Sequence, residues 1–169
     1  MTSESGKKPV KLAPKEMKAW RSYIEASRHL IDVLEGDLTI HNLSLTDYEI
    51  LTVIGQAKGG RIRMSDLALS SLVSKSRLSH RIKAMEKLGW VRKESCPEDK
   101  RGSFASLTSK GQKVLTGATM DHLQSVKNRF TQNLTSKDHE EVTRIFSKLT
   151  DALRAVYMED NCDSENNKK

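Results

Sequence analysis

The sequence predicts a mainly α-helical protein that carries one small β-hairpin. Apolar residues recur every three or four positions over most of the chain, which is typical of helices. Two short segments, 90–95 and 103–108, alternate apolar and polar residues as strands do. The net charge of +7 is concentrated in residues 61–102, which hold 11 Lys and Arg against 5 Asp and Glu. This local excess of base indicates a surface that meets a polyanion, with nucleic acid the leading candidate.

The first expected helix covers residues 15–38 and has a broad apolar stripe. Its apolar positions follow spacings of three and four: Met17, Trp20, Ile24, Ile31, Leu34 and Leu38. A stripe this long needs a long partner surface. Residues 1–14, which are polar and contain two prolines, are expected to be a mobile lead-in.

The second expected helix begins in "SLTDYEILTVIGQA" and ends before "KGG" at 58–60. Thr46 is the expected N-cap and Glu49, three residues on, completes a capping box. Glycine tolerates the left-handed conformation that ends many helices, so Gly59 and Gly60 indicate the end of this one.

A pair of helices follows. "RMSDLALSS" predicts a short helix, and Ser74 is the expected N-cap of a second that runs to Gly89. Leu78, Ile82 and Met85 share one side of that second helix. The opposite arc is polar and consists of Ser76, Arg77, His80, Lys83 and Lys87, with Arg81 on the flank.

The two alternating segments enclose the polar run "CPEDKRG" and predict a hairpin. Thr108 or Ser109 is expected to cap a helix over about 110–132, and "LTSKDHEEV" starts another through about 158. The last helix has a regular apolar stripe of Val142, Ile145, Leu149, Leu153 and Val156. Residues 159–169 are expected to be a disordered tail.

This order of elements is that of a winged helix-turn-helix, whose second paired helix enters the DNA major groove. Arg77 is placed to bind a guanine edge, and His80 a base or a phosphate. Lys83 and Arg81 are better placed for phosphates. The candidate DNA contacts on this helix are Ser74, Lys75, Ser76, Arg77, His80, Arg81 and Lys83. The alternative for each is an ordinary solvated side chain.

Across "LSLTDYEILTVI", "LVSKSRLSHRIKAMEKLGWVRKESCPEDKRG" and "LTSKGQKVL" the chain resembles the MarR family of bacterial transcriptional regulators. The resemblance implies that Arg101 of the wing reaches the minor groove, that Asp99 orients it, and that Lys100 lies beside them. Trp90 stands at a position where leucine is commoner in the family. The turn "LSSLV" lacks the glycine found in many helix-turn-helix motifs.

The resemblance also implies a homodimer. Residues 15–40 and 109–158 would form its dimerisation helices, and residues 41–108 the DNA-binding domain. The broad apolar stripes agree with this, although a monomer with a larger core is the alternative. A small aromatic or anionic effector is expected near Trp20, Arg21, Tyr23, His41 and Tyr48, where ordinary packing is the competing interpretation.

Several functions are not expected. The five histidines show no metal-ligand spacing, no P-loop or nucleophile motif occurs, and no apolar run is long enough to span a membrane. We therefore expect no enzyme, metal, cofactor or membrane partner. Two distant cysteines, Cys96 and Cys162, indicate a reducing cytoplasm, and a redox role for Cys96 is an alternative.

The sequence thus predicts a cytoplasmic, sequence-specific DNA-binding regulator, a homodimeric repressor on a pseudo-palindromic operator that a small ligand releases. Three alternatives stay open: a nucleoid-type protein that binds DNA without sequence choice, a thiol-responsive regulator of the same fold, and a protein–protein interaction module.

Overall fold

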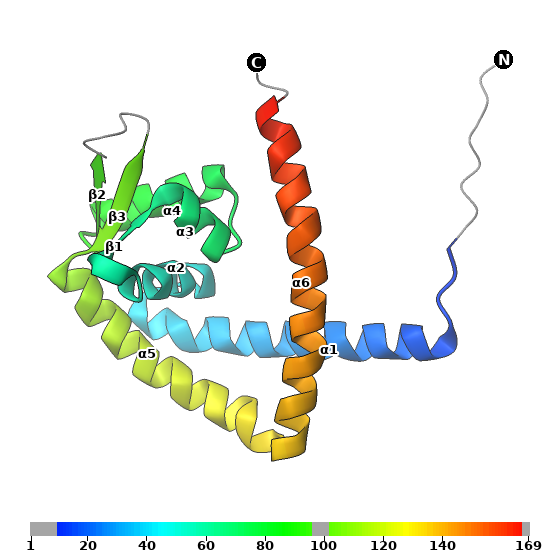
Figure 1. Ribbon diagram of the computed structural model, residues 1–169. Coiled ribbons are helices and arrows are strands. Elements are labelled where there is room, and N and C mark those ends of the chain that lie inside the picture. The colour runs from blue at the N-terminus through cyan, green and yellow to red at the C-terminus, as the bar shows by residue number, and fades with distance from the viewer. Residues whose placement is uncertain (1–9, 96–101, 167–169) are drawn as a thin grey trace. The chain divides into compact units, whose positions relative to one another are not determined.

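The structure, a computed structural model, describes residues 10–95 and 102–166, with the side chains of the last helix described through Arg154. Its regular elements in chain order are α1 Pro14–Leu38, α2 Leu45–Gly55, β1 Arg61–Arg63, α3 Met64–Ser70, α4 Lys75–Lys87, β2 Val91–Ser95, β3 Ser103–Leu107, α5 Ser109–Arg129 and α6 Ser136–Asn166 (Figure 1). Short 3₁₀ turns lie at Thr39–His41, Lys58–Gly60 and Thr131–Asn133. The predicted mainly α-helical fold with a β-hairpin is confirmed.

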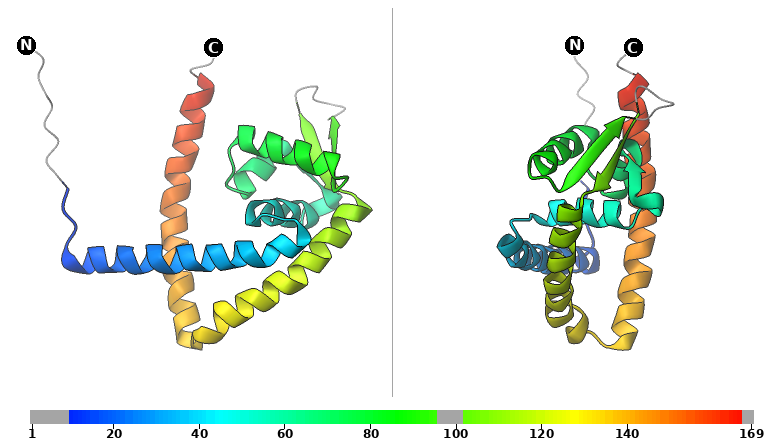
Figure 2. Two further views of the ribbon diagram at one scale, coloured as in Figure 1. Left: turned by 180° about the vertical axis from the view of Figure 1, so that it is seen from behind. Right: turned by 90° about the vertical axis from the view of Figure 1, so that its left-hand side faces the viewer.

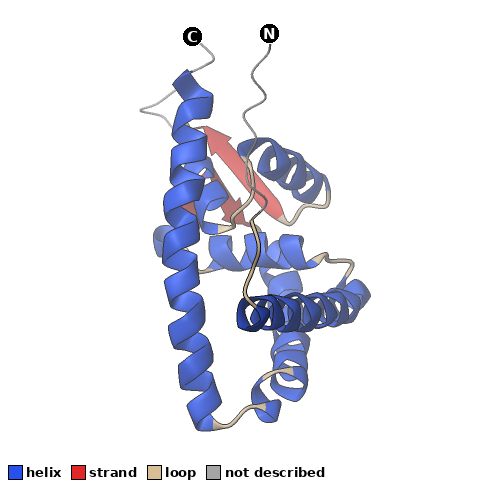
Figure 3. Cartoon of the chain, turned by 90° about the vertical axis from the view of Figure 1, so that its right-hand side faces the viewer, coloured by secondary structure: helices blue, strands red, loops and turns tan. Residues whose placement is uncertain are grey.

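The chain divides into two compact units, Met1–Gln124 and Ser125–Lys169, and the boundary falls inside α5. The first unit contains the winged helix-turn-helix. Within it, α2, α3 and α4 gather beside the three-stranded sheet (Figures 2 and 3). The second unit contains the end of α5 and all of α6.

The sheet has the strand order β1-β3-β2, and both pairings are antiparallel. The pairing of β2 with β3 is the predicted hairpin, with Val91 opposite Leu107 and Ser95 opposite Ser103. Strand β1 was not expected. It has three residues, too few for alternation to be recognised, and follows Gly59 and Gly60, whose φ angles of 74° and 72° turn the chain into the sheet.

The core of the first unit lies between the sheet and the helices. Leu78, Ile82 and Met85 of α4 are each 1% exposed, which confirms the predicted apolar side of that helix. They pack with Leu51 and Ile54 of α2 in one cluster. Because full burial of such a side chain contributes about 1.5–3 kcal/mol, this cluster fixes the orientation of α4 on the domain.

The start of α2 differs from the prediction, because Ser44 rather than Thr46 is the N-cap. Ser44 Oγ accepts a hydrogen bond from the Asp47 backbone N–H at 3.1 Å and donates to Asp47 Oδ2 at 2.7 Å. Starting two residues earlier places Leu43 just before the cap and Tyr48 at the fourth helical position, and both are buried in the core. This pair is a hydrophobic staple, which fixes the earlier start.

The turn between α3 and α4 forms without the glycine that many helix-turn-helix motifs have there. Leu72 has φ 51°, a left-handed conformation that glycine usually supplies, and its side chain is 65% exposed. The Val73 N–H donates to the Ala68 carbonyl at 3.1 Å across the turn. The turn therefore has the usual helix-ending geometry, at a cost of about 1–2 kcal/mol for a residue with a Cβ.

The last two helices begin where predicted and end differently. Thr108 Oγ1 accepts from the Gly111 N–H at 3.0 Å, so Thr108 caps α5. Thr135 Oγ1 accepts from the Asp138 N–H at 3.3 Å before α6. Helix α6 continues to Asn166, so the tail expected over 159–169 is helical to that residue. No glycine or proline interrupts residues 136–166, and nothing in that stretch forces the expected earlier end.

Candidate nucleic-acid interface

Helix α4 presents a polar, basic arc above its buried side. Ser74, in an extended conformation, is the N-cap, as predicted, and its Oγ accepts from the Arg77 backbone N–H at 3.4 Å. Starting the helix there turns its first residues to solvent. All seven candidate contacts are exposed: Ser74, Lys75, Ser76, Arg77, His80, Arg81 and Lys83.

Three of these side chains are available to a partner. Among the described residues, Arg77, His80 and Lys83 make no ion pair or side-chain hydrogen bond, although each carries or can carry positive charge. Arg77 lies in the first turn, where helix N–H groups also favour an anion. These three side chains can therefore contact phosphates and base edges without breaking an existing interaction.

Arg81 is different, because it is held within the chain. Its Nη1 lies 3.1 Å from Asp47 Oδ2 and 3.4 Å from Ser44 Oγ, at the start of α2. The pair ties the middle of α4 to the N-terminal end of α2. Its role as a phosphate contact stays a prediction.

The solvent face of the sheet adds basic residues that the sequence interpretation missed. The Arg61 and Arg63 guanidinium carbons lie 4.8 and 5.4 Å from the centroid of the Phe104 ring. Cation–π contacts at these distances hold the two side chains over the ring. The alternation of Arg61 and Arg63 about Ile62, directly after two glycines, was the signal that could have revealed them.

The expected wing contacts Asp99, Lys100 and Arg101 lie outside the described residues, as does Cys96. The strands that lead to them are described. Arg92 Nε lies 2.7 Å from Glu94 Oε1 on β2, so this base is paired within its own strand.

A cavity of about 490 Å³ lies between α2 and α5. Its lining carries no charged side chain and consists of Tyr48, Thr52, Gly55, Gln56, Gln112, Leu115, Thr116, Thr119, Met120 and Leu123. Tyr48 is 7% exposed, and its ring centroid lies 4.5 Å from that of His122. The cavity therefore fits a ligand that is apolar or aromatic and forms a few neutral hydrogen bonds.

The other expected effector residues do not line this cavity. His41 Nε2 lies 2.8 Å from Asp121 Oδ2 at the same junction of elements. Trp20 and Tyr23 contact each other on α1 with ring centroids 6.1 Å apart and are 54% and 44% exposed. At a rise of about 1.5 Å per residue, Trp20 lies roughly 27 Å along α1 from Leu38, so the chain does not bring it to Tyr48. Arg21, beside Trp20, is also exposed.

The described part of the chain contains neither a metal-binding group nor a membrane-spanning helix. Within residues 10–95 and 102–166 no three His, Cys, Asp or Glu side chains form a group that could hold a metal ion. No helix in those ranges is both long enough and apolar enough to cross a membrane.

Known proteins resemble this chain in sequence and in fold. A sequence model of the MarR family matches residues 41–102. AbsC, a MarR family transcriptional regulator from Streptomyces coelicolor, is 39% identical, with a TM-score of 0.83 over 87% of this chain and 99% of that one. Sco3205, a MarR family regulator from the same organism solved in complex with DNA, is 35% identical, with a TM-score of 0.83 over 88% and 93%. The transcriptional regulator HosA of Escherichia coli O111:H- is 29% identical over 66% of this chain and 80% of its own length.

The fold and the basic arc of α4 define a winged helix-turn-helix protein. With its similarity to AbsC and Sco3205 over most of the chain, the protein belongs to the MarR family of transcriptional regulators.

Proposed function

We propose that this protein is a cytoplasmic regulator that binds double-stranded DNA sequence-specifically as a homodimer. The observation that carries the proposal is α4, on which Arg77, His80 and Lys83 are exposed above a buried apolar side. A helix of this kind fits the major groove, where Arg77 can make a bidentate contact to guanine. The DNA complex of the similar Sco3205 supports the proposal.

The homodimer is supported by apolar surface outside the winged domain. Trp20, Tyr23 and Ile31 of α1 are between 44% and 54% exposed. The described part of α6 also exposes an apolar stripe, made of Ile145, Phe146, Leu149 and Leu153. Apolar faces of this length are usually covered in a stable protein, and a second copy provides a matching surface. A dimer would place two α4 helices on the half-sites of a pseudo-palindromic operator.

Release of the operator by a small molecule is the second part of the proposal. The cavity between α2 and α5 supports it, because a ligand there contacts the first helix of the winged domain and the helix that leads out of it. Since no charged side chain lines this cavity, the effector that fits it is a neutral aromatic compound. An anionic effector is not favoured at this place.

Selection of bound sequences from random duplex DNA tests the proposal. We expect one enriched pseudo-palindrome with half-sites about one helical turn apart. Bulk genomic DNA should compete far less well than the selected sequence. Equal competition would instead establish the nucleoid-type alternative.

Salt dependence separates DNA binding from a protein–protein role. Each phosphate contact contributes about −0.9 to the slope of log K against log [salt], so several contacts from two subunits give a steep slope. A flat salt dependence would contradict the proposed interface.

A further inference from the structure

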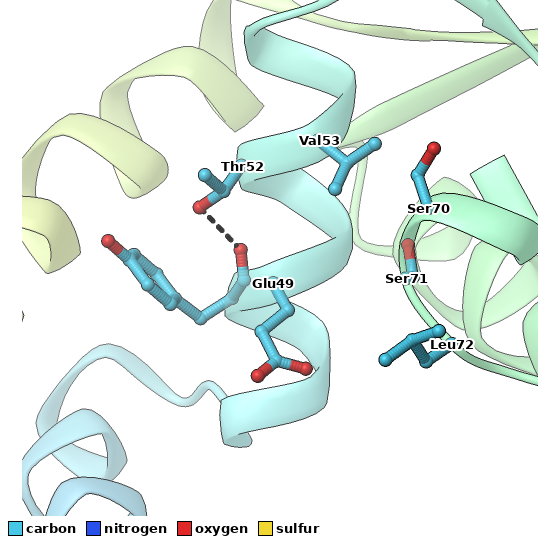
Figure 4. Close-up of a pocket in the computed structure, with 7 residues that line it drawn as sticks. Glu49, Thr52, Val53, Ser70, Ser71 and Leu72 are labelled. Atoms are coloured by element: carbon cyan, nitrogen blue, oxygen red, sulfur yellow. Dashed lines mark hydrogen bonds between the residues drawn. The ribbon is translucent and has the colours of Figure 1, made fainter. Parts of the chain in front are cut away.

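A second cavity, of about 290 Å³, lies on α2 beside the turn that joins α3 to α4. It is lined by Tyr48, Glu49, Thr52, Val53, Ser70, Ser71 and Leu72. Ser70, Ser71 and Leu72 form the wall opposite Val53 and Glu49 (Figure 4). It is distinct from the cavity between α2 and α5, with which it shares only Tyr48 and Thr52.

Ser71 gives this cavity an unused hydrogen-bonding group. The residue is 9% exposed, and its Oγ is buried without a hydrogen-bond partner among the described residues. Because this hydroxyl is also shut off from solvent, a ligand in the cavity gains its hydrogen bond only by moving the turn that carries Ser71.

Glu49 gives the same cavity an unpaired acid. None of the described residues donates a hydrogen bond to its carboxylate or forms an ion pair with it. Although the residue as a whole is exposed, its carboxyl is partly desolvated, and this burial raises its pKa, with the negative charge of Glu35 adding to the rise. A cation bound beside the carboxylate would stabilise its charged form and so oppose both effects.

Glu35 is not free to serve this role itself. Its Oε2 accepts the Leu45 backbone N–H at 2.8 Å, at the start of α2. Arg81 of the recognition helix is held by Asp47, two residues before Glu49. Glu49 is therefore the acid on this side of α2 that a ligand can reach without breaking a contact.

We infer that this cavity binds a small, single-ring ligand that carries a cationic nitrogen group, with Glu49 as its counter-ion and Ser71 as a hydrogen-bond partner. Thr52, Val53 and Leu72 provide the surface for the ring. This cavity, with its acid Glu49, favours a positively charged ligand and disfavours an anionic one. The α2–α5 cavity, which has no charged lining residue, favours a neutral ligand.

Occupancy of the cavity weakens operator binding, a step that rests on the proposed function. Leu72 lies two residues and Ser71 three residues before Ser74, the N-cap of α4. Leu72 holds a left-handed backbone conformation there, and a ligand packed on its side chain alters the turn that aims α4. By linkage, operator DNA weakens ligand binding by the same factor.

Isothermal titration calorimetry on the full-length, DNA-free protein tests the site with benzamidine, a planar aromatic cation, and with benzoate, an anion of similar size. We expect benzamidine to bind in the millimolar range typical of so small a ligand, and benzoate not to bind.

Glu49→Gln should weaken benzamidine binding on the order of tenfold. Ser71→Ala should also weaken it without lowering the melting temperature, since the lost hydroxyl has no partner. Glu140→Gln, an exposed acid on α6, is the matched control.

Equal binding of benzoate, absence of benzamidine binding, or full binding by Glu49→Gln would each overturn the site. Unchanged operator affinity at saturating benzamidine would overturn its coupling to DNA. A protein that binds no operator in the absence of ligand would contradict the proposed function instead, and the calorimetry would still decide the site.

Discussion

Arg81 of α4 and Asp47 of α2 form an ion pair, with Nη1 3.1 Å from Oδ2 and 3.3 Å from Oδ1. The Asp47 side chain is 16% exposed and that of Arg81 is 46% exposed, so the pair is half-buried. Asp47 also accepts from Ser44, the N-cap of α2. The recognition helix is thus fastened at its middle to the start of the first helix of the domain.

Removing the pair should loosen α4 rather than remove a phosphate contact. We expect Arg81→Ala to lower the free energy of unfolding by about 0.5–1 kcal/mol, as for a partly exposed ion pair. Asp47→Asn should cost a similar amount, and the double variant less than the sum. Operator affinity should fall with an unchanged salt slope. A slope reduced by about 0.9 in Arg81→Ala would show instead that Arg81 neutralises a phosphate.

Arg77 should read a base. We expect Arg77→Ala to relax the preference at one base pair in each half-site, because a bidentate contact to guanine contributes about 1–3 kcal/mol of discrimination. Binding to a set of single-base operator variants measures this. Lys113→Ala, an exposed base on α5, serves as the control. A uniform loss over all operator variants would make Arg77 a phosphate contact.

The sequence predicted the parts of the fold that periodicity controls and missed those that single contacts control. The arc of Leu78, Ile82 and Met85 was predicted because a buried helix side repeats over several turns. The start of α2 was misplaced by two residues, because the staple between Leu43 and Tyr48 is a tertiary contact. Strand β1 exists only through its pairing with β3, a partner distant in the sequence.

The candidate site divides in the same way. The exposed arc of α4 follows from helical spacing, and the structure bears out its exposure. The partner of Arg81 could not be inferred, since Asp47 lies on another helix. The grouping of Trp20 and Tyr23 with Tyr48 assumed that neighbouring elements would meet, whereas α1 is a long helix that carries the two aromatic residues away from that junction.

Leu72 should be replaceable with a gain in stability. Asn tolerates the left-handed region better than Leu, and the Leu72 side chain is mostly exposed, so little apolar burial is lost. We expect Leu72→Asn to raise the free energy of unfolding by about 0.5–1 kcal/mol, measured by urea denaturation. Leu69→Asn, at an exposed helical position nearby, should not stabilise. Destabilisation by Leu72→Asn would mean that packing of Leu72 outweighs its backbone strain.

Gly111 should tolerate no side chain. A Cβ there would overlap the backbone carbonyl of Trp90, which cannot move without breaking its hydrogen bond from the Thr108 N–H at 2.9 Å. We expect Gly111→Ala to lower the free energy of unfolding by about 1–3 kcal/mol. Gly36→Ala in α1 is the matched control, because no atom apart from its chain neighbours and its own helix backbone lies within 4 Å of a Cβ placed there. That variant should gain up to about 1 kcal/mol from helix propensity. Equal effects of the two substitutions would contradict the close approach at Gly111.

His122 should make the first unit sensitive to acid. Burial lowers the pKa of its imidazole below the usual 6.5, and the nearby charge of Asp37 opposes this only in part. Its Nδ1 is buried with no hydrogen-bond partner among the described residues, so a proton placed there has no acceptor. The Tyr48 ring lies beside it.

The direction of the pH effect follows from proton binding. Between the lowered pKa of the folded state and the ordinary value near 6.5, the unfolded chain binds more protons at His122 than the folded chain does. The stability that neutral His122 provides is therefore complete above pH 6.5 and is lost as the pH falls toward the folded-state pKa.

Urea denaturation from about pH 7.5 to about pH 5.5 should show a steeper fall for the wild type than for His122→Gln. His80→Gln, at an exposed position on α4, should retain the wild-type slope. A His122→Gln profile parallel to the wild type would show that the pKa of His122 is the same in the folded and the unfolded chain. The acid sensitivity would then arise elsewhere in the chain.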